Sequence, residues 1–88
     1  MSQKHNSFFE LSLSERIQYL YRYGSFQIAI RYYGHKVNLY LLDGEYIEVF
    51  YNHREDRIDK VEALDYGHTR MKFYTDQIGL SYLFKSLN

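Results

Sequence analysis

The chain contains no cysteine, no proline and no tryptophan among its 88 residues. The lack of cysteine excludes disulfide bonds and thiolate metal ligands, and it agrees with a reducing compartment. No apolar run approaches the roughly 20 residues that span a bilayer. The first fifteen residues include Glu10 and Glu15 and have no apolar run of a signal peptide. We therefore expect a soluble cytoplasmic protein without a membrane partner.

The length and composition predict a single domain. Single domains cluster near roughly 100 to 150 residues, and a chain that is 45% hydrophobic and 19% aromatic is too apolar for disorder. We expect one domain over residues 1–88, with residues 1–7 frayed. A chain of this size buries only about 60% of its unfolded surface, so its stability should be modest, about 5 kcal/mol.

Acidic residues are missing between Glu15 and Asp43, although the formal net charge of the chain is zero. That stretch has a charge of +4, and the stretch from Asp43 to Asp65 has eight acids and three bases, a charge of −5. Eight of the eleven tyrosines lie between Tyr19 and Tyr51. The uneven distribution of charged and aromatic residues bears on the partners of the protein and not on its fold. The four bases of the first stretch are Arg16, Arg22, Arg31 and Lys36.

A helix is predicted over residues 13–23. Ser12 and Glu15 have the spacing of a capping box at its start. An apolar stripe follows at helical spacing, formed by Leu13, Ile17, Leu20 and Tyr21. Gly24 is expected to end the helix in the left-handed conformation.

Residues with alternating polarity after Phe26 predict β-strands. In a first strand over residues 26–33, Ile28 and Ile30 point to the opposite side from Arg31. We expect a short turn at Gly34-His35, after which Val37, Leu39 and Leu41 continue the apolar side opposite Tyr32, Ile30 and Ile28.

The Asp43-Gly44 sequence predicts a second hairpin, and its loop length decides which residues enter the core. A two-residue loop would place Glu48 opposite Leu39, in the core. A three-residue loop, Leu42-Asp43-Gly44, aligns Ile47 with Leu39 and Val49 with Val37. Since a slip of one residue turns the whole strand over, the hydrophobic pattern favours the three-residue loop.

A fourth strand is predicted over residues 57–63, after a polar turn over residues 52–56. It can set Ile47 beside Val61, Phe50 beside Ile58, and Glu48 beside Lys60 as an ion pair. The expected fold class is α+β: an N-terminal helix, a four-stranded antiparallel β-meander and a C-terminal helical segment, with the helices packed on the sheet.

The sequence pattern near the C-terminus predicts a helix over residues 76–86. The segment before it, residues 70–74, is predicted to be either a helical turn or a fifth strand. The fourth strand carries four charged residues, which discourage edge pairing. The first strand has only one charged residue, Arg31. We expect its edge to be covered, either by residues 70–75 or by a second copy of the chain.

One face of the predicted sheet combines aromatic and basic residues. In the three-residue-loop register it holds Ala29, Arg31, Tyr33, Lys36, Asn38, Tyr40, Leu42, Tyr46, Glu48 and Phe50. Such a face suits a dimer interface or packing of the C-terminal segment. It also suits single-stranded nucleic acid, because aromatic rings stack on bases and cations neutralise phosphates.

No pattern predicts catalysis, a cofactor or a metal site. The five glycines are isolated, so there is no phosphate-binding loop, and the serines lack a nucleophile elbow. A metal site would need His53 and His68 to converge with carboxylates, and their spacing matches no known ligand pattern.

The sequence thus favours a small non-catalytic protein-interaction module. We expect it to form a homodimer, or to bind another protein, through the aromatic face or the edge of the first strand. The predicted partner-binding residues are Arg31, Tyr33, Tyr40, Tyr46 and Phe50, with Arg22 and Tyr23 as a secondary patch. The alternative function is single-stranded nucleic-acid binding on the same face.

Overall fold

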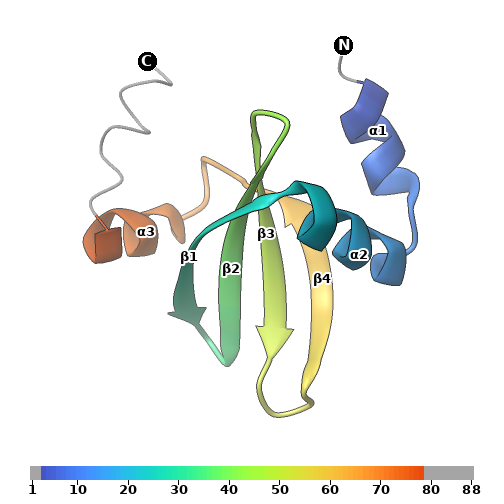
Figure 1. Ribbon diagram of the computed structural model, residues 1–88. Helices are drawn as coiled ribbons and strands as arrows, with labels where there is room; N and C mark the ends of the chain where they lie inside the picture. The colour runs from blue at the N-terminus through green and yellow to red at the C-terminus, as the bar shows by residue number, and fades with distance from the viewer. Residues whose placement is uncertain (1–2, 79–88) are drawn as a thin grey trace.

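The computed structural model describes the backbone of residues 3–78 and the side chains of residues 7–75. Four strands form one antiparallel sheet in chain order, with two helices before it and one after it (Figure 1). The α+β fold predicted from the sequence is confirmed. The elements are α1 (Gln3–Glu10), α2 (Leu13–Tyr23), β1 (Ser25–Tyr32), β2 (His35–Leu42), β3 (Glu45–Asn52), β4 (Arg57–Ala63) and α3 (Met71–Ile78).

Helices pack against both faces of the sheet, so the core has two parts. Figure 1 shows α1 and α2 on the β4 side of the sheet and α3 on the β1 side. The face that we call the α2 face buries Leu42, Ile47, Val49 and Val61 against Phe8 and Leu20. The opposite face, which we call the α3 face, buries Ile30, Val37, Leu39 and Phe50 against Leu64, Met71 and Tyr74.

Helix α2 has the predicted bounds and the predicted capping box. The Ser12 hydroxyl accepts from the Glu15 amide, and the Glu15 carboxylate accepts from the Ser12 amide. The prediction of a left-handed Gly24 is wrong, since this residue is extended, with φ −87° and ψ 163°. Glycine is needed there for space, because a Cβ atom would lie 2.7 Å from the Leu20 carbonyl oxygen.

Two hairpins turn through pairs of residues with positive φ. The values are 46° and 82° at Tyr33-Gly34 and 50° and 82° at Asp43-Gly44, as a type I′ turn requires. The predicted Gly34-His35 turn is therefore wrong by one residue, and His35 begins β2. The apolar residues stay on the predicted side, but the pairing moves, so that Ile30 lies opposite Val37.

The predicted three-residue loop between β2 and β3 is wrong. Leu42 pairs with Glu45 and Leu39 pairs with Glu48, which leaves a two-residue loop. Glu48 is consequently in the core, with none of its surface exposed. The hydrophobic pattern excluded this register because it buries a carboxylate, but the carboxylate has buried partners from a distant part of the chain, Arg70 and Tyr74.

The fourth strand has the predicted bounds but a different register. Val49 pairs with Val61, and a bulge interrupts the ladder after Phe50. The predicted ion pair between Glu48 and Lys60 is wrong, because Glu48 faces Glu62 along the ladder. The Lys60 Nζ atom instead lies 3.7 Å from a Glu62 carboxylate oxygen and 4.5 Å from the centre of the Phe50 ring.

Helices α1 and α3 compare differently with the prediction. Helix α1 was not predicted, and it begins inside the segment over residues 1–7 that was expected to fray. Residues 71–74 are helical, so the alternative of a fifth strand there is wrong. Of the predicted helix over residues 76–86, residues 76–78 belong to α3 and the others lie outside the described residues.

Candidate binding surface

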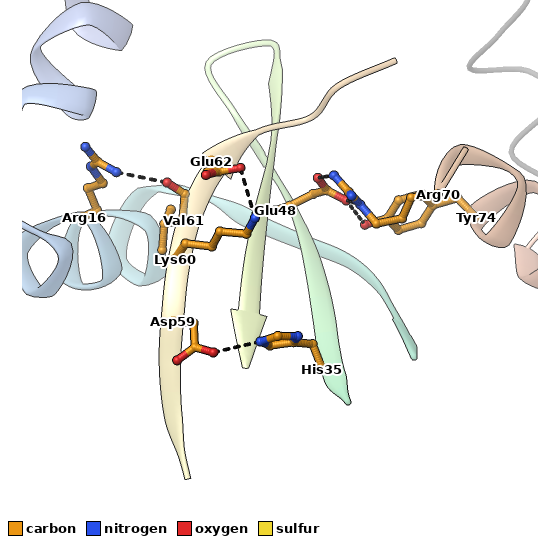
Figure 2. Close-up of polar contacts among 9 residues, drawn as sticks. All are labelled: Arg16, His35, Glu48, Asp59, Lys60, Val61, Glu62, Arg70 and Tyr74. Carbon is orange, nitrogen blue, oxygen red and sulfur yellow. Dashed lines mark hydrogen bonds and ion pairs between the residues drawn. The ribbon is translucent and has the colours of Figure 1, made fainter. Parts of the chain in front are cut away.

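A buried group of three side chains fixes α3 to the sheet (Figure 2). The Arg70 guanidinium donates to both carboxylate oxygens of Glu48, from Nε at 2.9 Å and from a terminal nitrogen at 2.7 Å. The Tyr74 hydroxyl donates to the same carboxylate at 2.7 Å. Burial and the neighbouring Glu48 raise the pKa of Tyr74. These groups bind one another and are closed to solvent, so they serve the fold and not a ligand.

The α2 face has an uncovered part. Helices α1 and α2 pack on β3, β4 and the end of β2, while the β1–β2 part of this face stays open. Along it, Ala29 and Asn38 are half-buried and Arg31 and Lys36 are exposed. We call this surface the open strip; it consists of Phe26, Ala29, Arg31, Lys36, Asn38 and Tyr40.

Figure 1 shows the β1–β2 and β3–β4 turns at the same end of the sheet. A groove lies at this end. We call it the basic groove. It has a volume of about 670 Å³ and continues into a hollow of about 320 Å³ beside Lys36. Arg31 and His53 line both spaces, which makes the basic groove and the open strip one continuous surface. The groove is lined by Arg31, Tyr33, Gly34, His35, Asn52, His53 and Arg54.

The charge of this surface is entirely positive. Arg31 stands directly opposite Lys36 on the neighbouring strand, and Arg54 lines the same groove. No carboxylate lines either space, and among the described residues none of the three cations has an ion pair. Like charges directly opposite each other destabilise a sheet, so the fold gains nothing from this arrangement. An anionic ligand would remove the repulsion.

A hydrogen-bond network holds the strand ends beneath the groove together. The Asp59 carboxylate binds His35 Nε2 at 2.8 Å (Figure 2). It also binds Asn52 Nδ2 at 3.1 Å and Arg57 Nε at 3.0 Å. These bonds, the one to His35 foremost, lower the pKa of Asp59 to about 2. Since His35, Asn52 and Asp59 come from β2, β3 and β4, the network fixes the relative positions of three strands at the groove.

The two edges of the sheet differ in their protection. On β4, the Arg16 guanidinium donates to the carbonyl of Val61 at 3.0 Å (Figure 2). It also donates to the carbonyl of Phe9. On β1, helix α3 approaches through Phe73, whose ring centre lies 5.4 Å from that of Tyr32. Helix α3 adds no strand, so the backbone edge of β1 has no β-partner within residues 3–78.

The seven predicted binding residues do not form one surface. Arg31 and Tyr33 meet in the basic groove, and Tyr33 has 84% of its surface exposed. Tyr40 lies at the far end of the open strip, with its ring centre 5.6 Å from that of Phe26 and 5.8 Å from that of Tyr21 on α2. These residues occupy the predicted face, because the side chains of β1 and β2 point to the two faces of the sheet as the sequence predicted.

The other four lie elsewhere. Tyr46 and Phe50 are on the α3 face, where Phe50 is buried at 3% exposure and Tyr46 is half-buried. The register slip of one residue turned β3 over and moved both away from the open strip. Arg22 and Tyr23 line a separate shallow pocket on α2, with the Arg22 guanidinium 5.7 Å from the Tyr23 ring centre.

Five residues of the groove were not among the predicted binding residues: Gly34, His35, Asn52, His53 and Arg54. Asn52, His53 and Arg54 belong to the segment that was interpreted as a polar turn, in which His53 was considered as a metal ligand and not as part of a binding surface. A meander places every second turn at the same end of the sheet, so the turns after β1 and β3 must be neighbours. Combining that topology with the charges of both turns would have brought Arg54 and His53 beside Arg31.

The two histidines considered as metal ligands have separate surroundings. His53 packs on Tyr51, with ring centres 5.0 Å apart, and His68 packs on Tyr32 at 5.9 Å. No group of three or more His, Cys, Asp or Glu side chains suited to a metal ion occurs in the described part of the chain. No helix in that part is long and apolar enough to cross a membrane.

Comparison with protein-family models, with curated proteins and with solved structures found no significant match. Function must therefore be argued from the surface itself.

Proposed function

We propose that this protein is a small non-catalytic interaction module that self-associates by pairing the β1 edges of two copies. The observation that carries this proposal is the contrast between the two edge strands. Edge β4 has four charged side chains and a carbonyl bound by Arg16, two devices that prevent strand addition. Edge β1 has one charge, Arg31, and its strand begins beside the exposed ring of Phe26.

The geometry of the first hairpin identifies the backbone groups that a partner strand would meet. Tyr32 and His35 flank the two-residue turn, so they form a hydrogen-bonded pair, and Ile30 with Val37 form the next one. The amides of Ala29 and Arg31 therefore point away from β2. Within residues 3–78 they have no β-partner, so a second strand can pair with them, as in β-strand addition.

An antiparallel pairing centred on Ala29 uses nearly the whole strand. It sets Ile28 of one copy beside Ile30 of the other, and Arg31 beside Gln27, with no like charges opposed. A pairing centred on Arg31 would oppose two guanidinium groups. The Ala29-centred pairing also places the apolar side chains of both strands on the same side of a continuous sheet.

The mass in solution tests the proposal. Light scattering at several concentrations should give twice the chain mass of 10.8 kDa, in low and in high salt alike. Salt should have little effect because main-chain hydrogen bonds and apolar contacts hold the strands together. A monomer at every concentration and salt would overturn the proposal.

A further inference from the structure

We propose that the basic groove and the open strip bind single-stranded nucleic acid. This inference rests on the α2 face and not on the pairing of β1, and it would hold for a monomer as well as a dimer. Two observations carry it: a set of cations that have no ion pair among the described side chains, and exposed aromatic rings along the same surface.

The cations form a track for a sugar-phosphate backbone. Lys36 and Arg31 face each other across β1 and β2, and Arg54 lies at the other side of the groove, next to His53. Elsewhere in the described chain, arginine side chains near carboxylates are paired, as Arg57 is with Asp59 and Arg70 with Glu48. The three groove cations are thus available to neutralise phosphates.

The aromatic rings lie at both ends of the track. Tyr33 occupies the groove end, where a positive φ of 46° places it on the tip of the turn. Phe26 and Tyr40 occupy the other end, and 55% of Phe26 is exposed. Lys36 and Tyr40 are four residues apart on one strand, about 13 Å. Exposed rings together with cations on one sheet surface form the stacking platform of single-strand binders.

An acidic peptide would satisfy the cations but would leave the aromatic rings without a specific role. Nucleic acid uses both, because each base offers a flat face for stacking and each phosphate offers one negative charge. Double-stranded DNA is a poorer fit, since its bases are stacked on one another and closed to Tyr33 and Phe26.

Fluorescence anisotropy with a labelled oligothymidylate of about 12 nucleotides tests this inference. We expect binding in about 50 mM salt and an affinity lower by at least tenfold in about 200 mM salt, as contact with three phosphates requires. No binding in low salt, or an affinity that salt does not change, would overturn the inference.

Two charge-reversal variants distinguish binding at this surface from attraction by the net charge of the protein. Lys36→Glu should weaken oligothymidylate binding at least tenfold. Lys72→Glu is the matched control, because Lys72 is an exposed cation on α3 and gives the same change in net charge. It should change the affinity by less than twofold. Equal losses from both variants would show that the net charge, and not this surface, attracts the ligand, and would overturn the proposal.

Two further probes test the nucleic-acid class. Tyr33→Asn, which suits the positive φ of this position, should weaken binding severalfold without changing the fold. Oligoglutamate of the same charge should compete poorly with the oligothymidylate. Competition as strong as that of unlabelled oligothymidylate would assign the surface to acidic peptides instead.

Discussion

Arg70 holds both carboxylate oxygens of Glu48 inside the core, and the side chains of the two residues are exposed by only 8% and 0%. Neither charge reaches bulk water, so each depends on the other. The pair, with Tyr74, is the polar link between α3 and the sheet.

Loss of one member of this pair should unfold the protein. Arg70→Met leaves the Glu48 carboxylate buried without a counter-charge, which costs about 3–5 kcal/mol. That is close to the whole stability expected of so small a domain, about 5 kcal/mol. Urea denaturation followed by circular dichroism should give a chain that is largely unfolded in water or near its transition.

The double variant Glu48→Leu, Arg70→Met is the control for that prediction. It removes both charges and keeps apolar volume, so it should recover most of the lost stability. Equal destabilisation in the double variant would mean that packing of the Arg70 stem, and not its charge, holds α3.

Lys36→Glu should stabilise the fold. The substitution replaces the repulsion between Lys36 and Arg31 with an attraction across the strands, worth about 0.2–1 kcal/mol. The urea midpoint should rise, and Lys36→Gln should give a smaller rise. If the variant is more stable and binds oligothymidylate less well, Lys36 contributes to ligand binding and lowers the stability of the fold. A lower midpoint would contradict the repulsion inferred at this pair.

Ala29→Pro should abolish the dimer and leave the monomer folded. Proline removes only the amide that points away from β2, and edge strands tolerate proline at such positions. Light scattering should give one chain mass, with the circular dichroism spectrum of the parent protein. Ala29→Ser retains the amide and should remain dimeric. A dimer formed by Ala29→Pro would show that another surface mediates the contact.

Acid should weaken the groove network in a defined pH range. The pKa of Asp59 is lowered to about 2 in the folded chain from an ordinary value of 3.8. The folded state therefore binds the proton less readily than the unfolded chain. Its stabilising contribution is complete above about pH 4 and is lost as the pH falls toward 2.

The variant Asp59→Asn isolates this effect. Its urea midpoint should be lower than that of the parent at pH 6, and the difference should shrink between about pH 4 and pH 2. A difference that stays constant over this range would show that Asp59 contributes no pH-dependent stability. The other carboxylates titrate in both proteins and cancel in the comparison.

Local signals in the sequence predicted much of the fold. The capping box and the apolar stripe predicted the bounds of α2. The charged residues and the polar turn before them predicted the bounds of β4. These features depend on residues within a few positions of one another. The same holds for the alternation that placed Arg31, Lys36 and Tyr40 on one side of β1 and β2.

The error in the register of β3 has its origin in a long-range partner. The hydrophobic pattern rejects a buried Glu48, but Arg70 and Tyr74 lie 22 and 26 residues further along the chain. No local rule detects that compensation, and the resulting slip placed Tyr46 and Phe50 on the wrong face. The groove residues His53 and Arg54 were missed for a related reason, since only the topology brings them to Arg31.

The contact between Arg16 and the Val61 carbonyl has a consequence for synthesis on the ribosome. It joins residues 45 positions apart, so α1 and α2 leave the ribosome long before the strand on which they pack. Until β4 is complete, Arg16 has no Val61 carbonyl to bind, and Phe8 and Leu20 lack part of their apolar cover. The helices α1 and α2 are made before the sheet but reach their final environment only when β4 has formed. A nascent chain stalled before residue 61 should therefore still expose them to chaperones.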